Sequence, residues 1–370
     1  MQQQGITVEQ AITKFLTKYE ILDYIIPYGF AGSNSNKLNI YIDLYGLYRT
    51  ILSRNYRIII TDYTSIATGI INICAHYRSY FRYLGVHTKF FLISSYNVPL
   101  DSLHTVVNIP EKNNSADPYN KTMLEKLEMT NQREILELNM ELLELICPYL
   151  PDIFYLKTKA FESSVLMNHI MNLENPDIPS LIISTDAMPM QLCGIRNNVS
   201  MIWPRKYGYR AEDNSLIICS KTHSEHKKSF WNVFAQKTAK TSLFDYLCNI
   251  EPSNFVLVQS INGMVERNLK SLIHINQLIK ILSQVPGFDS CKITPEILFD
   301  MVPSKYFDDM IVRGLIEIRY KLMDVDYQYL FYKESIESKH IHYENLDDQA
   351  AVQAINDKYF KNNPIDLYRL

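Results

Sequence analysis

Three acidic residues lie at positions where they could bind a metal ion: Asp43, Glu162 and Asp186. Asp43 closes a short apolar run at 39–43, and Asp186 follows another at 181–184. Such runs are typical of buried parallel strands, and Glu162 opens an apolar helix after a third one. Ligands bind beyond the carboxyl ends of parallel strands. We therefore expect these carboxylates to share one edge of a sheet.

Carboxylate oxygens at such an edge would bind a hard divalent cation, Mg²⁺ or Mn²⁺. A two-metal centre needs several carboxylates to hold its ions about 4 Å apart. Three acids supply one weak site, so the sequence predicts a residual metal site. The alternative interpretation is that each acid caps the helix that follows it, which is the commoner role for a single acid at such a place.

The elements that must position these acids alternate along the chain. Apolar runs predict strands at 39–44, 88–94, 153–156 and 181–184. Helical spacing predicts helices at 7–26, 45–52, 64–83, 123–145 and 160–171. Helices that alternate with apolar strands indicate βαβ units and a parallel sheet.

Shorter strand candidates follow at 200–203 and 215–219, and the chain is mainly helical after about residue 242. The Lys- and Thr-rich stretch 237–241 suggests a boundary. We predict an α/β core with an N-terminal helix at 1–235 and a helical region at 236–370. The Tyr- and acid-rich tail after about residue 300 suits docking to a protein partner, because Tyr buries much area at low entropic cost. An ordinary C-terminal subdomain is the alternative.

Composition limits the classes of partner. The formal net charge of the 370 residues is -3, so no global basic field attracts nucleic acid, and binding would need a local patch. The six cysteines form no CxxC pair, which favours reduced thiols and a cytoplasmic protein. No run reaches the roughly 18 apolar residues of a membrane span, so no membrane partner is expected.

The order and spacing of the acidic blocks resemble the flap endonuclease and 5′-3′ exonuclease family, a branch of the PIN-like nucleases, over residues 38 to about 285. Residues 39–52 look like the family's opening strand, whose metal-binding Asp falls on Asp43. Residues 89–95 look like the strand that normally ends in Phe-Asp-Gly. Here that strand ends in Ser94 and Ser95, so an acid is missing.

Two further blocks resemble the family in the same incomplete way. Residues 161–164 look like the Glu-Ala-Asp-Asp motif, with Glu162 in place and two serines where paired acids would stand. Residues 183–192 look like Ser-x-Asp-x-Asp-x-x-Gln-Leu, with Asp186 on the first acid and Met188 on the second. The segment between Tyr96 and Leu145 then resembles the family's helical arch.

The family's helix-hairpin-helix variant opens Gly-Asp-x-x-Asp-Asn-Ile and continues into a Gly-rich hairpin that grips DNA. Residues 261–269 resemble it, keeping Gly263 and Asn268 but replacing both acids with Met264 and Arg267. The hairpin at 271–276 has no Gly, so its backbone approaches phosphate less closely. The resemblance to the helix-hairpin-helix variant is weaker than the resemblance of the acidic blocks.

The resemblance implies a PIN-like fold, and the missing acids favour a catalytically inactive scaffold that binds protein or nucleic acid. No cofactor is then expected. The alternative is an active 5′ nuclease that uses one Mg²⁺ or Mn²⁺ on a reduced ligand set. A third possibility is an unrelated α/β module whose strand-end acids are caps. The Ile-, Asn-, Lys- and Tyr-rich composition suits a phage or large virus, which would place the protein in the host cytoplasm or the virion.

Basic and aromatic residues suggest where nucleic acid or a partner could bind. The compact cluster at 205–210 contributes Arg205, Lys206, Tyr207 and Arg210. Lys121 and Arg133 on the arch segment could contact phosphate. Because the arch cations alternate with glutamates, a salt-bridged solvent face is the alternative there.

Overall fold

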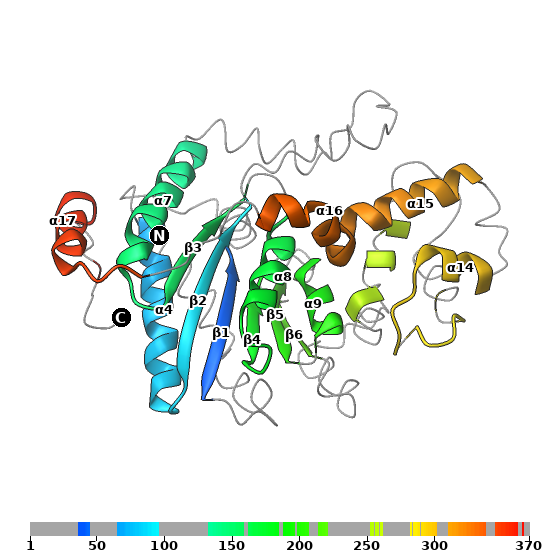
Figure 1. Cartoon of the computed structure of the whole chain (residues 1–370), viewed down its shortest axis with the longest axis horizontal. Helices are drawn as coiled ribbons and strands as arrows, with labels where there is room; N and C mark the ends of the chain where they lie inside the picture. The colour runs from blue at the N-terminus through cyan, green and yellow to red at the C-terminus, as the bar shows by residue number, and fades with distance from the viewer. Residues whose placement is uncertain are drawn as a thin grey trace, which may run out of the picture. The chain divides into compact units, whose positions relative to one another are not determined.

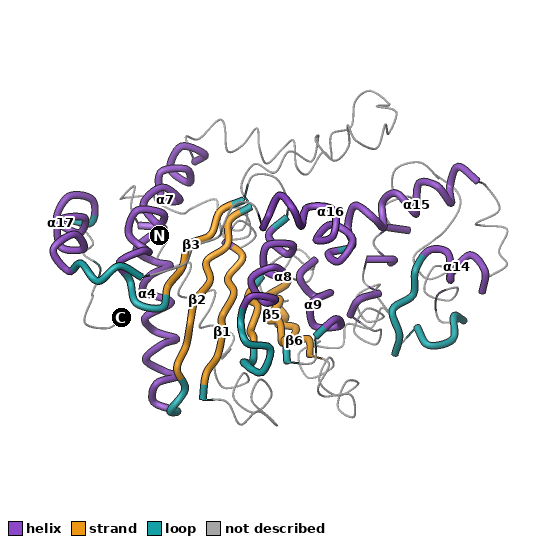
Figure 2. Tube along the Cα trace, viewed as in Figure 1, coloured by secondary structure: helices purple, strands orange, loops and turns teal. Residues whose placement is uncertain are grey.

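The computed structural model of the protein divides into two compact units, each drawn in Figures 1 and 2. Unit 1 consists of Met1–Ala160 and Ile341–Leu370, and unit 2 of Phe161–His340. The structure describes residues 36–44, 65–95, 132–158, 162–184, 188–196, 198–206, 214–220, 252–254, 256–258, 260–261, 282, 284–288, 290–301, 310–337, 345–361 and 365.

Three parallel strands form the sheet of unit 1: β1 (Lys37–Asp43), β2 (His87–Ser94) and β3 (Ile153–Lys157). β2 lies in the middle and pairs with β1 on one side and β3 on the other. Both faces are largely buried, which explains continuous apolar runs in place of alternation. The register aligns Tyr41, Phe91 and Phe154, whose rings stack with centroids 4.9 and 5.5 Å apart.

Helix α4 (Ser65–Tyr83) packs against β2 through side chains at helical spacing. Ile66, Ile70, Tyr77 and Phe81 are all buried and follow the i, i+4, i+11, i+15 pattern of one helix face. Gly85, with φ +76°, ends the helix. The N–H of Gly85 donates to Arg82 O at 2.9 Å and that of Val86 to Phe81 O at 2.8 Å, which is a Schellman motif.

Helix α7 (Gln132–Ile146) packs on α4 and continues through a 3₁₀ turn, Cys147–Tyr149, to β3. Asn139, fully buried on α7, accepts a hydrogen bond from the N–H of Ala67 at 2.8 Å. That N–H lies in the first turn of α4 and has no partner within its own helix. A side chain 72 residues away therefore completes the start of α4.

The C-terminal part of unit 1 holds the turn that precedes β3. Asp152 in this turn has φ 55°, a left-handed conformation that is unfavourable for a residue other than Gly. Asn345 stabilises it, since its Oδ1 accepts the N–H of Asp152 at 2.9 Å and its Nδ2 donates to Leu150 O. Helix α17 (Gln349–Tyr359) follows, capped by Asp348.

We expect Asn345→Ala to lower the free energy of unfolding of unit 1 by about 2 kcal/mol, because the strained turn loses both hydrogen bonds. Urea unfolding followed by circular dichroism measures the loss, and amide hydrogen exchange at 152–154 locates it. Gln353→Ala, on an exposed side chain of α17, is the matched control. Equal stability and equal exchange in the two variants would contradict this role for Asn345.

Unit 2 contains β4 (Ser180–Ile183), β5 (Val199–Lys206) and β6 (Asn214–Ser220). β4 pairs with β5 in parallel, and β5 pairs with β6 in antiparallel fashion. Helix α8 (Ser163–Leu173) precedes β4 and is buried from Ser163 to Met171, as an interior helix should be. A 3₁₀ turn, Met188–Met190, leads into the short helix α9 (Gln191–Ile195).

The remainder of unit 2 is helical: a 3₁₀ turn at Pro252–Asn254, then α14 (Pro295–Met301), α15 (Met310–Met323) and α16 (Val325–Glu337). α16 packs on α8. Asn254, fully buried, fixes the segment before α14. Its amide donates to Phe288 O and Cys291 O at 2.9 and 2.7 Å and accepts the N–H of Ile293 at 2.6 Å.

The predicted α/β class with parallel strands and a mainly helical C-terminal region is confirmed. The predicted helices at 7–26 and 45–52, most of the arch segment, and the boundary at 235/236 fall outside the described residues. Those predictions stay predictions. No helix in the described part of the chain is long and apolar enough to cross a membrane.

Candidate functional site

The carboxyl edge of the unit 1 sheet carries one carboxylate among hydroxyl groups. Asp43 ends β1 and is 3% exposed, as predicted for a strand-end acid. β2 ends in the buried Ser94 and Ser95, and Thr158, buried after β3, donates its N–H to Ser94 O at 2.9 Å. Among the described strand-end residues of this unit, Asp43 is the only acid. A single carboxylate beside neutral hydroxyls attracts a divalent cation weakly.

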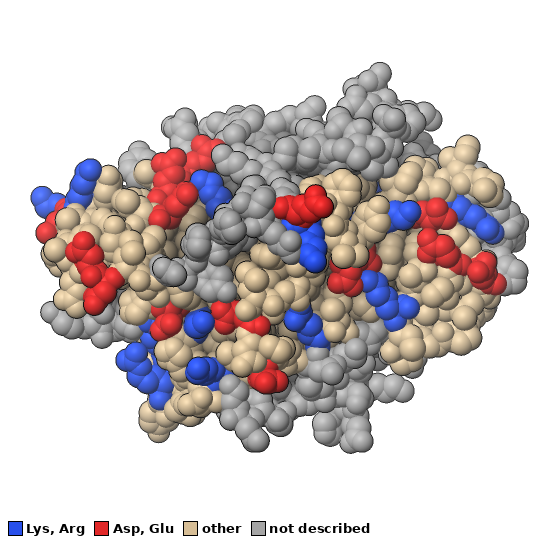
Figure 3. Space-filling model, in the orientation of Figure 1, with Lys and Arg blue, Asp and Glu red and all other residues tan. Residues whose placement is uncertain are grey.

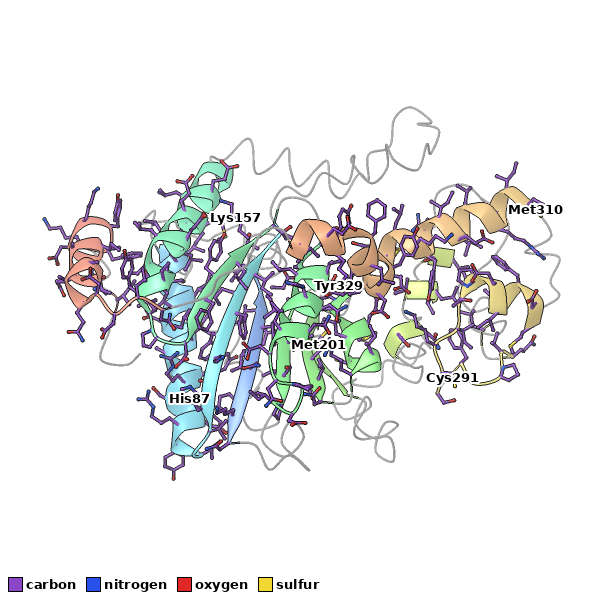
Figure 4. All side chains as sticks on the ribbon, viewed as in Figure 1. His87, Lys157, Met201, Cys291, Met310 and Tyr329 are labelled. Carbon is purple, nitrogen blue, oxygen red and sulfur yellow. The ribbon has the colours of Figure 1, made fainter. Side chains whose placement is uncertain are left out.

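The remaining polar side chain at this edge is already engaged. Lys157 is the last residue of β3 and is labelled in Figure 4 beside α7. Its Nζ lies 3.0 Å from the Glu144 carboxylate of α7. The pair is partly exposed, so it orients the two side chains and adds little stability. Glu144 is thus directed to Lys157 rather than to the end of β1.

Glu162 occupies the position that the sequence predicts, at the start of α8 in unit 2. Its backbone is extended, and its carbonyl accepts the N–H of Val165 at 3.1 Å, as an N-cap residue does. Its carboxylate, however, makes no cap hydrogen bond. Capping by the side chain, the alternative role for this acid, is therefore wrong for Glu162.

The carboxylate of Glu162 lies within electrostatic reach of α16. Burial raises the pKa of the Tyr332 hydroxyl on that helix, and the charge of Glu162 raises it further. One turn earlier on α16, Tyr329 packs against His169 of α8, with ring centroids 6.0 Å apart, and Figure 4 labels it there. Tyrosines expected to dock a partner are thus partly used to attach α16 to α8.

Asp186, the third predicted ligand, lies outside the described residues. β4 does end at Ile183, and the buried Ser184 follows it. Asp43 belongs to unit 1 and Glu162 to unit 2, so the shared site of three acids stays a prediction. Within the described part of the chain, no group of three or more His, Cys, Asp or Glu side chains could hold a metal ion.

Gln191 follows the predicted acidic strand end and proves to be a structural connector. It is 1% exposed, at the start of α9. Its Nε2 donates to Met188 O at 3.2 Å and to Met323 O at 3.0 Å, and its Oε1 accepts the N–H of Val325 at 3.1 Å. The amide therefore joins α9 to the junction of α15 and α16, and both of its N–H donors are used within the protein.

Two charged side chains at the junction of α15 and α16, those of Asp324 and Lys292, were not identified from the sequence. Asp324 is buried between α15 and α16, and its Oδ1 accepts the N–H groups of Asp326 and Tyr327 at 2.9 and 3.0 Å. Lys292 Nζ lies 2.8 Å from Asp324 Oδ2 and 3.2 Å from Asp326 Oδ2. An Asp before an apolar run is a helix-start signal that could have identified the cap. No feature of the sequence around Lys292 predicts that it pairs with Asp324.

The basic residues predicted to bind nucleic acid or a partner are described only in part. Arg205 and Lys206 end β5, where their backbones pair with Ser215 and Asn214 of β6. Arg133 lies in the first turn of α7. The predicted Lys121, Tyr207 and Arg210 lie outside the described residues. Figure 3 shows cationic and anionic side chains interspersed among the described residues of the visible face.

Burial makes two of the described cysteines, Cys74 and Cys147, poor nucleophiles. Cys74, Cys147, Cys193 and Cys291 form no disulfide. Burial raises the pKa of the Cys74 thiol to about 12 and that of Cys147 well above its usual value. Both are therefore protonated at neutral pH and unreactive.

No protein-family model and no curated protein matches the sequence. Among solved structures, the chain is similar to the T5 D15 protein co-crystallized with metal ions, at a TM-score of 0.48 and 15% sequence identity. The similarity covers 88% of this chain and 97% of that chain. The T5 D15 protein is thus a distant structural neighbour.

Proposed function

We propose that the protein is a non-catalytic flap-endonuclease-like scaffold that binds a protein partner, or a partner together with nucleic acid, in a viral complex. The observation that carries the proposal is the carboxyl edge of the unit 1 sheet. There Asp43 stands with Ser94, Ser95 and Thr158 in place of further carboxylates. Neutral hydroxyls supply little of the charge that draws in and holds a pair of metal ions.

Exposed apolar side chains support a protein partner. Unit 2 exposes large apolar groups on two helices: Met310 and Ile311 on α15, and Leu330 and Phe331 on α16. Figure 4 labels Met310 at the outer end of α15. Each of the four side chains is more than 60% exposed. Apolar and aromatic side chains of this kind are what the core of a protein–protein interface buries.

A second function is favoured by one observation. The carboxylate of Glu162 is not used for capping, so it remains a candidate ligand with Asp43 and Asp186. Those three acids would hold one Mg²⁺ or Mn²⁺ in an active 5′ nuclease. The ion would activate water and stabilise charge on the scissile phosphate.

A nuclease assay separates the two functions. We expect the full chain, incubated with flap, nicked and single-stranded DNA in Mn²⁺, to cleave none of them faster than its Asp43→Asn, Asp186→Asn double variant. The asparagines keep the size of the side chains while removing two charges. Cleavage that disappears in the double variant would establish the active nuclease and overturn the scaffold proposal.

The matched control is Asp177→Asn with Asp357→Asn, one exposed acid in each unit. Any cleavage that survives equally in wild type, double variant and control comes from a contaminant. Fluorescence anisotropy with the same DNA measures binding. Affinity that falls with salt concentration, without cutting, supports a scaffold that holds nucleic acid through its phosphates.

A further inference from the structure

The inner side of helix α16 packs within unit 2. Val325, Gln328 and Ile336 are buried, at positions that share one side of the helix. Tyr329 lies on the same side and contacts the His169 ring of α8, and Figure 4 labels it where the two helices meet. Any further partner of α16 therefore has to contact the outer side of the helix.

The outer side of α16 carries an apolar stripe made of Tyr327, Leu330 and Phe331. These residues are spaced i, i+3 and i+4, which places their side chains next to one another on one helix face. The exposed fractions of the three residues are 47%, 71% and 62%. Large apolar side chains that adjoin one another in water are unfavourable, and such patches mark sites of interaction. The apolar stripe is therefore a candidate interface.

Charges of opposite sign lie at the two ends of the apolar stripe. At the first end, Lys321 Nζ lies 5.9 Å from the centre of the Tyr327 ring, a cation–π contact. At the other end, the exposed Glu334 follows Leu330 by one helical turn. Neither charged side chain forms an ion pair with another residue in the described part of the chain. Both are therefore available to a partner.

Glu334 also lies in an unfavourable place within its own helix. The carboxyl end of a helix carries a partial negative charge, which disfavours acids and favours cations. Glu334 belongs to the last turn of α16, and that turn contains no basic residue. Lys333 precedes it, but neighbours in sequence point to different sides of a helix. A cation brought from outside the helix would therefore stabilise this end of the apolar stripe.

The apolar stripe is complementary to a second copy of itself. Packing two copies of α16 antiparallel, about a two-fold axis between positions 330 and 331, places position 327 of one copy opposite position 334 of the other. Lys321, which lies beside Tyr327, then meets Glu334 of the second copy, and the symmetry forms the same pair twice. The antiparallel arrangement also brings the opposite ends of the two helix dipoles together.

We propose that α16 forms the interface of a homodimer. The apolar stripe of one copy packs against that of the second copy, and Lys321 pairs with Glu334 across the two-fold axis. A single pair of helices buries less than the roughly 1,600 Å² of a standard interface, so the dimer is weak and forms as the protein concentration rises. The inference rests on the exposed apolar side chains that support the proposed function, and it names a second copy of the chain as their partner.

Sedimentation velocity of the full chain, at concentrations from about 1 to about 300 μM, measures the association. The wild type should shift from monomer to dimer over this range. Phe331→Glu places a charge in the middle of the apolar stripe and should stay monomeric throughout. Because Phe331 is exposed, this variant keeps its fold, which circular dichroism checks. The matched control is Tyr83→Glu, at an aromatic residue of α4 that is 88% exposed, and it should dimerise as the wild type does.

Charge reversal separates this dimer from non-specific association of apolar side chains. Lys321→Glu and Glu334→Lys each bring like charges together at both symmetric pairs and should weaken dimerisation roughly tenfold. The double variant restores opposite charges and should recover the wild-type affinity. A wild type that stays monomeric, a dimer that Phe331→Glu leaves unchanged, or a double variant as weak as the single ones overturns the inference. None of these outcomes changes the result of the nuclease assay, so the proposed function stands or fails separately.

Discussion

Replacing Gln191 by Leu is expected to lower the free energy of unfolding of unit 2 by about 3 kcal/mol. The substitution keeps the volume of the side chain and removes its amide. Met323 O and Val325 N, at the end of α15 and the start of α16, then lose their partner in a buried place. Helix ends leave such groups unsatisfied within the helix, and Gln191 supplies one partner to each of them.

Tryptophan fluorescence during urea unfolding measures this loss. Both tryptophans of the chain, Trp203 and Trp231, fall in the sequence range of unit 2. The control is Glu334→Leu on an exposed position of α16, which should change stability by no more than about 0.5 kcal/mol. A Gln191→Leu protein as stable as this control would show that the amide is not a structural connector. Its place in the motif would then have to be explained by a ligand.

Gln191 also makes contacts that could not be predicted from the sequence. Its spacing after a strand-end acid resembles a nuclease motif, yet its partners at Met188, Met323 and Val325 are backbone groups. Two of them lie more than 130 residues away. A backbone carbonyl or N–H has no signature in the sequence, so no pattern could have identified these contacts.

The strands were predictable because a strand buried on both faces needs apolar side chains at consecutive positions, and such runs can be seen in the sequence. Runs such as 40–42 and 90–93 are apolar on consecutive residues, as a strand covered on both faces requires. Helix α4 was predictable for the same reason, since its buried residues repeat at helical spacing and Gly85 stops it. Local chemistry determined these elements, and the structure agrees with them within a few residues.

The candidate site was predictable only in its placement. Sequence put Asp43 at a strand end and Glu162 at a helix start, and both lie there. Whether the Glu162 carboxylate caps α8 depends on its side-chain rotamer and on the side chains of α16 near it. The motif specifies neither of these. The turn at Asp152 could not be predicted either, because Asn345, which stabilises it, lies 193 positions away.

Replacing Asp324 by Ala should have the largest effect on stability, a loss of about 4 kcal/mol. The change removes a helix cap that accepts two N–H groups, which costs about 1 to 2 kcal/mol. It also leaves the partly buried Lys292 with Asp326 as its remaining partner. Asp324→Asn is the matched variant, because Asn caps helices as well as Asp does but carries no charge. Its loss should be about half as large.

The pH dependence separates the cap from the ion pair. Burial lowers the pKa of Lys292, but its hydrogen bond to Asp324 and the charges of Asp324 and Asp326 outweigh this and raise the pKa above 10.5. A raised folded pKa contributes stability that is complete below pH 10.5 and is lost as the pH rises through the folded pKa. Tyr320 acts in the same direction, because burial and then the charge of Asp324 raise its pKa.

The difference in unfolding free energy between wild type and Asp324→Asn should therefore be constant near neutral pH and shrink above about pH 10.5. Urea unfolding by tryptophan fluorescence at a series of alkaline pH values measures it. The difference between Asp324→Asn and Asp324→Ala reflects capping and should not change with pH. Parallel curves for wild type and Asp324→Asn across the whole range would mean that the charge of Asp324 contributes nothing to stability, and that Asp324 acts only as a helix cap.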